Sequence, residues 1–174
     1  MQVGTMAPPE SGAATRSDSR TGKYLAFQLG REEFAIQVLK VREIMGIQDI
    51  TAVPQTPVFV KGVINLRGKV IPVVDLRLKF GLPEVEYTQR TCIIVVQIKG
   101  PDGGVSLTGI VVDGVSEAVN IAAGEIEDTP DFGDGVSTPY ILGMAKSKGK
   151  VKILLDIDKV LQAQKLDGLE SMLQ

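Results

Sequence analysis

The chain contains no histidine and no tryptophan, and only one cysteine among its 174 residues. Histidine is the commonest general base and metal ligand, so its absence removes most hydrolytic and metal-dependent mechanisms. The single Cys92 can form neither an internal disulfide nor a cysteine metal cluster. We expect it to be a small buried hydrophobe in a reduced, cytoplasmic protein, and we expect neither a metal site nor a cofactor.

The chain is also poor in aromatic residues, at 5%, and its formal net charge is only −2. A surface that binds nucleic acid needs clustered basic residues and stacking aromatic side chains, so a nucleic-acid-binding barrel is not expected. No window of the sequence reaches the roughly 18 consecutive apolar residues of a membrane span, and the N-terminus lacks the apolar core of a signal peptide. We therefore predict a soluble protein without membrane insertion.

Apolar residues make up 44% of the chain, and with so few aromatics the core must consist mainly of Val, Ile and Leu. These residues in short runs favour strands. The stretch from Val60 to Leu76 predicts a hairpin, because two β-branched runs flank Arg67-Gly68-Lys69. Gly68 can take the positive φ of a tight turn, which would hold Arg67 beside a rigid hairpin.

The hairpin pattern returns at residues 142–157, at an offset of 81 residues (143 − 62 = 81). A second repeat relates residues 35–43 to residues 109–117, at an offset of 74 residues (110 − 36 = 74). Two copies are too few for a solenoid, which usually needs three or more repeats. We therefore predict two similar β-subdomains that pack on each other.

Composition changes suggest the limits of these units. Residues 1–22 are rich in Ala, Pro, Ser, Thr and Gly and are predicted to be disordered. Subdomain 1 is predicted at about 23–87 and subdomain 2 at about 88–155, with the first strand open to exchange between them. Residues 156–174 are predicted to form a C-terminal helix or tail. Its apolar face has two candidate sites, one on a barrel and one in a partner's groove.

Shorter segments also have predicted structures. Residues 91–99 are expected to form a strand that is covered on both faces, because the run is almost entirely apolar. Residues 57–61 are expected to form a single helical turn, since Thr56 can cap it and Pro57 can open it. Residues 125–137 are expected to be a solvent-exposed loop, because five acidic residues, two glycines and a proline lie within them.

An enzyme would have to use carboxylates, and Asp75 and Asp113 are the pair to test. Two aspartates at strand ends of a duplicated β-protein resemble the layout of aspartic proteases. However, Leu76 follows Asp75, where those proteases have a small hydroxyl residue, and the two aspartates belong to different repeats. The alternative is that each carboxylate accepts backbone hydrogens at a strand end. We expect no enzymatic activity.

A binding surface is the more promising hypothesis. Arg67 is either a solvated turn residue or a positioned contact, and Glu43 has the same two readings. The repeat places Lys148 at the position equivalent to Arg67 (67 + 81 = 148). The second hairpin therefore keeps the positive charge but not the planar guanidinium group, which binds carboxylates in a different geometry.

The sequence resembles the CheW coupling proteins of bacterial chemotaxis over residues 23–161. The resemblance rests on the runs Phe34–Ile44, Phe59–Phe80 and Gly109–Val119. It implies an all-β fold of two packed five-stranded SH3-like β-barrels with short helical turns. It also implies a non-enzymatic adaptor in two-component signal transduction, which joins the cytoplasmic tip of a methyl-accepting chemoreceptor to the histidine kinase CheA in membrane-associated arrays.

The resemblance further implies a groove between the subdomains in which the receptor helix docks. The residues expected to face that helix are Val38, Val41, Glu43, Gly62, Arg67 and Val115. The regulatory domain of CheA, itself CheW-like, would pair through the barrel ends, with contact residues that remain unknown. The alternative is the CheW-like part of a CheV-type protein or of a non-chemotactic kinase scaffold. The length is expected to leave no room for a receiver or kinase domain.

Overall fold

The structure is a computed structural model that describes residues 19–133, 138–147 and 149–162. Most of these residues lie in strands, and no helix among them is long and apolar enough to cross a bilayer. Residues 1–18 of the predicted disordered extension and residues 163–174 of the predicted C-terminal helix lie outside the described part of the chain.

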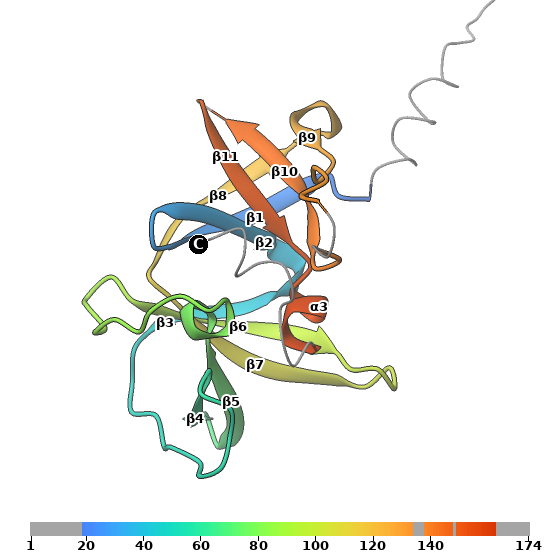
Figure 1. Cartoon of the computed structure of the whole chain (residues 1–174). Coiled ribbons are helices and arrows are strands. Elements are labelled where there is room, and N and C mark those ends of the chain that lie inside the picture. Colours follow the sequence, from blue (N-terminus) through green and yellow to red (C-terminus); the bar gives the residue numbers. More distant parts are fainter. Residues whose placement is uncertain (1–18, 134–137, 148, 163–174) are drawn as a thin grey trace, which may run out of the picture.

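The strands form two sheets, which occupy the upper and lower halves of Figure 1. In order across the sheet, the six-stranded sheet contains β8 (Gly114–Ile121), β1 (Gly22–Leu29), β2 (Glu32–Gln37), β11 (Lys150–Leu155), β10 (Ile141–Ser147) and β9 (Ile126–Glu127). In order across the sheet, the five-stranded sheet contains β3 (Val41–Gly46), β6 (Cys92–Lys99), β7 (Val105–Val112), β5 (Lys69–Asp75) and β4 (Val60–Leu66).

All neighbouring strands are antiparallel except two pairs. Strands β2 and β11 are parallel in the six-stranded sheet, and β5 and β7 are parallel in the five-stranded sheet. In the described part of the chain, three short helical segments join strands, η2 (Val38–Lys40), α2 (Leu76–Lys79) and η3 (Ala123–Glu125), and α3 (Ile157–Gln162) follows the last strand.

The element bounds confirm the duplication, and they show that equivalent strands lie in opposite sheets. The offset of 81 carries β4 and β5 onto β10 and β11, and the offset of 74 carries β2 and β3 onto β7 and β8. Strands β1 and β2, from the first half of the chain, belong to the six-stranded sheet. Strands β6 and β7, from the second half, belong to the five-stranded sheet. A boundary between residues 87 and 88 therefore runs across both sheets rather than between them.

Three hydrophobic clusters fill this arrangement. One cluster lies inside the five-stranded sheet and includes Ile93 and Val95, and another lies inside the six-stranded sheet around Tyr24. The third and largest takes residues from both sheets, including Ile94 and Val96. Strand β6 alternates between two cores, which confirms that it is covered on both faces and explains why its residues 93–96 are fully buried.

The remaining local predictions have mixed outcomes. The predicted helical turn at 57–61 is instead a hydrogen-bonded turn in which the Val60 N–H donates to the Pro57 carbonyl, followed directly by β4. The predicted loop at 125–137 contains the end of η3 and the two residues of β9, because Ile126 is buried in the core. The described part of the C-terminal helix, α3, packs back on the protein, with Ile157 and Val160 in the shared cluster.

Candidate functional site

The hairpin of β4 and β5 presents Arg67 at its tip. Leu66 pairs with Lys69, so the turn consists of Arg67 and Gly68, whose φ angles are 51° and 87°. Two residues with positive φ form the tight hairpin turn that matches the twist of the flanking strands. The side-chain oxygen of Asn65 accepts a hydrogen bond of 2.7 Å from the Gly68 N–H. The direction in which Arg67 leaves the hairpin is therefore set by the backbone.

Arg67 is held by Glu43 of β3. Its Nη2 donates to Glu43 Oε1 at 2.6 Å and its Nη1 to Glu43 Oε2 at 3.2 Å, which is a two-point guanidinium–carboxylate pair. The hydrogen bond from Arg67 lowers the pKa of Glu43, and Glu43 raises the pKa of Arg67. Because the Arg67 side chain is 72% exposed, the pair adds little to stability and mainly fixes the position of two charges at the surface.

The pair also joins the two edges of the five-stranded sheet. Strands β3 and β4 stand at opposite ends of the strand order, yet Glu43 on one reaches the turn that follows the other. A backbone bridge between Thr51 and Val63, with both hydrogen bonds at 2.9 Å, links β4 to the segment that follows β3. The sheet is therefore curled on itself, as a small barrel requires.

The predicted contact residue Gly62 lies behind this surface. It is buried in β4 with φ at 142°, and a Cβ added there would lie 1.9 Å from the Thr51 carbonyl oxygen. Gly62 thus permits the close approach of Thr51, in the segment between β3 and β4. Its observed role is structural.

The predicted contact valines are half-buried. Val38, Val41 and Val115 all pack against the cluster shared by the two sheets. Val41 lies opposite Val96 in the five-stranded sheet, and Val115 lies opposite Phe27 in the six-stranded sheet. The structure thus brings the three valines to one core and pairs Glu43 with Arg67.

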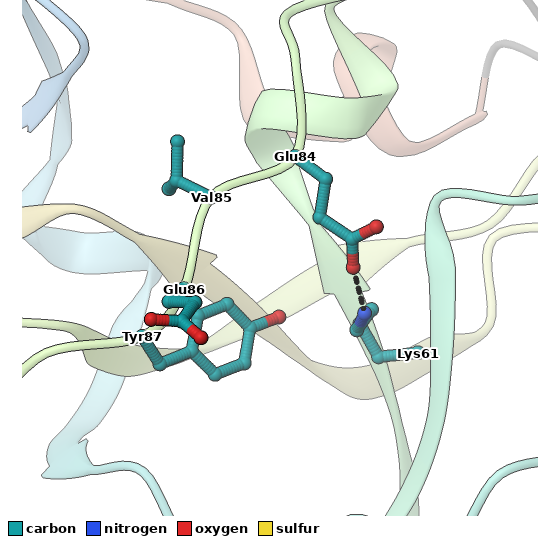
Figure 2. Close-up of a pocket in the computed structure, with 5 residues that line it drawn as sticks. All are labelled: Lys61, Glu84, Val85, Glu86 and Tyr87. Carbon is teal, nitrogen blue, oxygen red and sulfur yellow. Dashed lines mark hydrogen bonds and ion pairs between the residues drawn. The ribbon is translucent and has the colours of Figure 1, made fainter.

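None of the six predicted residues lines the cavity drawn in Figure 2. That cavity has a volume of about 400 Å³ and is lined by Lys61, Glu84, Val85, Glu86 and Tyr87. Lys61 and Glu84 point toward each other and form an ion pair of 2.9 Å, and the Tyr87 hydroxyl donates to Asp75 at 2.8 Å. Lys61 and Glu84 therefore already have partners in each other, and the Tyr87 hydroxyl has a partner in Asp75.

The aspartates considered for catalysis have structural partners. Asp75 caps α2 by accepting from the Leu78 N–H at 3.3 Å. Asp113 accepts from the Gly30 N–H at 2.7 Å and from Arg77 at 2.7 Å. The prediction that each carboxylate accepts backbone hydrogens is confirmed.

Comparison with known proteins identifies the family. A family model described as a CheW-like domain matches residues 23–165. The chain belongs to the CheW family. It is 40% identical to the chemotaxis protein CheW of Klebsiella aerogenes over 144 residues, which cover 83% of this chain and 84% of that protein. It is 32% identical to the chemotaxis protein CheW of Bacillus subtilis, over 85% of this chain and 92% of that protein.

A solved CheW structure has the same fold. The crystal structure of the scaffolding protein TtCheW from Thermoanaerobacter tengcongensis matches with a TM-score of 0.72 at 32% sequence identity. The match covers 83% of this chain and 94% of that chain. The all-β fold, the CheW family and a non-enzymatic scaffold role in chemotaxis are therefore established for this chain.

Sequence reasoning did not single out one exposed residue and two ion pairs near the predicted receptor-facing valines. Leu39, between Val38 and Lys40 in η2, is 94% exposed beside two of the predicted contact valines. Ion pairs join Lys40 to Asp158 and Arg77 to Asp113, and their partners are far apart in sequence. The repeat offset was the available signal, because Arg77 and Asp158 are separated by the same 81 residues as the two hairpins.

Proposed function

We propose that this chain is an adaptor that couples the cytoplasmic tip of a methyl-accepting chemoreceptor to the histidine kinase CheA. Membership of the CheW family supports both partners in general terms. The receptor helix docks on the residues predicted for it: Val38, Val41, Glu43, Gly62, Arg67 and Val115. The CheW-like part of a CheV-type or non-chemotactic kinase scaffold is the alternative.

The exposed pair of Arg67 and Glu43 carries this proposal. A hairpin turn and a neighbouring strand hold the two opposite charges in place before any partner arrives, so a partner meets a fixed pattern of donors and acceptors. Such a pattern selects the orientation of a helix whose apolar face packs on half-buried valines. Gly62 also allows the close approach of Thr51 beneath the hairpin.

Two exposed valines support pairing of the kinase through the barrel ends. Val70 of β5 is 67% exposed and Val151 of β11 is 49% exposed. Each is the second residue after its hairpin turn, at equivalent positions of the two repeats. A CheW-like regulatory domain carries the same kind of hairpin, so apolar residues at the two tips suit the pairing of one barrel with another.

The test is capture of a receptor-tip helical fragment and of the CheA regulatory domain by the purified chain. Arg67→Ala should weaken capture of the receptor fragment and leave capture of the kinase domain and thermal unfolding nearly unchanged. Alanine adds no backbone strain, since Arg67 already carries a Cβ at φ 51°. Arg67→Lys keeps the charge and should restore capture only in part, because lysine lacks the planar two-point geometry.

Lys69→Ala is the matched control, since it removes an exposed positive charge two residues away. Capture of the receptor fragment should be unchanged in this variant. Equal capture by the wild-type chain and Arg67→Ala would remove Arg67 from the contact. A wild-type chain that binds neither partner would leave a CheW-family scaffold with a different role.

A further inference from the structure

The chain passes from one sheet to the other at two places within its described residues. The first crossover is η2, between β2 of the six-stranded sheet and β3 of the five-stranded sheet. The second is Asp113, between β7 of the five-stranded sheet and β8 of the six-stranded sheet. Val38 lies in the first crossover and Val41 directly follows it, whereas Val115 lies two residues after Asp113. The contact valines of the proposed function are therefore at or beside the two crossovers.

Asp113 forms a clasp at the second crossover. Its Oδ2 accepts from the backbone N–H of Gly30, in the turn between β1 and β2, at 2.7 Å. The same oxygen accepts from Arg77 Nη1 of α2 at 2.7 Å, and Arg77 Nε donates to the Pro83 carbonyl at 3.0 Å. Because α2 follows β5 of the five-stranded sheet and Gly30 lies in the turn between two strands of the six-stranded sheet, this carboxylate links the two sheets.

Asp158 forms a second clasp at the first crossover. Its Oδ1 accepts from the backbone N–H of Lys99, at the end of β6 in the five-stranded sheet, at 2.9 Å. Its Oδ2 accepts from Lys40 Nζ of η2 at 2.8 Å. Gln162, also on α3, donates to the Lys99 carbonyl at 2.6 Å. The helix that follows the six-stranded sheet is thereby fixed to the five-stranded sheet.

The two clasps are reciprocal, and their charges are inverted. Arg77 and Asp158 are equivalent residues of α2 and α3 at the offset of 81. In one clasp the helix supplies the cation and the crossover the carboxylate, and in the other the helix supplies the carboxylate and the crossover the cation. Both halves of the chain thus make the same inter-sheet link with different side chains.

The clasps are shielded from solvent more than the Arg67 pair. The side chains of Arg77 and Asp113 are 13% and 27% exposed, and those of Lys40 and Asp158 are 25% exposed each. Partly buried charges are screened less by salt than exposed ones. Each carboxylate also accepts a backbone N–H, which fixes its direction more firmly than an ion pair between two long side chains.

We propose that Asp113 and Asp158 are positioning residues, which hold the two sheets in one relative orientation and so set the shape of the surface formed by Val38, Val41 and Val115. The inter-sheet orientation stands on the contacts above, and its effect on receptor docking rests on the proposed function. Loss of both clasps lets the sheets sample other orientations. Only the fraction of molecules in the native orientation then binds a helix tightly.

The experiment measures the inter-sheet distance directly. Spin labels on Val70→Cys and Val151→Cys, in a Cys92→Ser background, report the separation of the two hairpins by pulsed electron spin resonance. We expect one narrow distance distribution for the parent chain. We expect a broader distribution in Asp113→Ala and in Asp158→Ala, and the broadest in the double variant. Hydrogen exchange at the Gly30 and Lys99 amides should accelerate in the respective single variants.

Asp102→Ala is the control, because Asp102 also accepts a backbone N–H, from Gly104 at 2.9 Å, but within a single turn. It should leave the distance distribution unchanged. Lys40→Met is the milder variant if the alanine variants fold poorly, since it leaves the bond between Asp158 and the Lys99 amide in place. We expect it to broaden the distribution less than Asp158→Ala.

Receptor-fragment binding is measured on the same variants. If one molecule in ten of the double variant keeps the native orientation, binding weakens about tenfold. An unchanged distance distribution in a folded double variant, together with faster exchange of both amides, would overturn the positioning role. Failure of the parent chain to bind the fragment would instead count against the proposed function and leave the distance result standing.

Discussion

Phe34 is the residue whose loss should most clearly reveal how the two sheets depend on each other. It lies on β2, is fully buried, and belongs to the cluster shared by both sheets. Its ring centroid is 6.1 Å from that of Phe27 in the same sheet and 5.5 Å from that of Phe80, which follows α2. Phe34→Ala therefore leaves a cavity between the sheets rather than within one of them.

The expected cost is large. A buried Phe→Ala substitution lowers the free energy of unfolding by about 3–5 kcal/mol, and two aromatic neighbours place Phe34 toward the upper end of that range. For a denaturation slope of about 2 kcal/mol per molar urea, the midpoint should fall by about 2 M. Phe132→Ala is the matched control, because the Phe132 side chain is 39% exposed and should change stability far less.

The three tyrosines provide the assay. Tyr24 lies in the core of the six-stranded sheet, Tyr140 lies in the shared core, and Tyr87 packs against the core of the five-stranded sheet. Fluorine-labelled tyrosine should thus give one NMR resonance for each core, and there is no tryptophan to interfere with tyrosine fluorescence as a second probe. The exchange of strands between sheets predicts one common unfolding midpoint for all three, shifted together by Phe34→Ala.

Separate midpoints for Tyr24 and Tyr87 would refute this reasoning, because they would show that one sheet unfolds while the other persists. A loss below about 1 kcal/mol would equally contradict the burial of Phe34 between the sheets, since that value is typical of far less critical positions.

Two further predictions concern the five-stranded sheet. Gly62→Ala should lower the free energy of unfolding by more than the roughly 1–3 kcal/mol of backbone strain alone, because the new Cβ also meets the Thr51 carbonyl. Gly68 has φ at 87° and open space around it, so Gly68→Ala should lower the free energy of unfolding by the strain alone. Urea titrations measure both values. Burial, followed by the hydrogen bond to Asp75, raises the pKa of Tyr87 above its ordinary value of 10.0. The stability from this shift is present below pH 10 and declines as the pH rises toward the folded-state pKa, so Tyr87→Phe should flatten the fall in the melting temperature above pH 10. An equally steep fall in Tyr87→Phe would assign the alkaline transition to other groups.

Local sequence signals predicted the strands well. The hairpin around Gly68 and its repeat follow from β-branched runs interrupted by a glycine, and turn chemistry of this kind acts within a few residues. The buried strand β6 follows from its apolar run. The prediction of a continuous loop at residues 125–137 was wrong because one apolar residue of that polar segment, Ile126, is buried in the core. Its burial places β9 in the six-stranded sheet.

The candidate site was predictable only in part. Resemblance to CheW supplied Arg67 and Glu43 as separate candidates, but the pair between them joins residues 24 positions apart on strands that are not neighbours in the sheet. The link from Gly30 to Asp113 spans 83 positions, and the link from Lys40 to Asp158 spans 118. No periodicity reports contacts of this length, because periodicity describes only which side of its own strand a residue occupies.

By itself, the sequence determined that the protein is duplicated, rich in strands and a member of the CheW family. These properties depend on short runs of apolar residues and on the repeat offset, which can be read directly from the sequence. The tertiary structure alone decided which strands pair, and hence that each sheet is built from both halves of the chain. Pairing depends on the burial of whole strands against distant partners. The inter-sheet core and the two aspartate clasps exist only once that exchange has taken place.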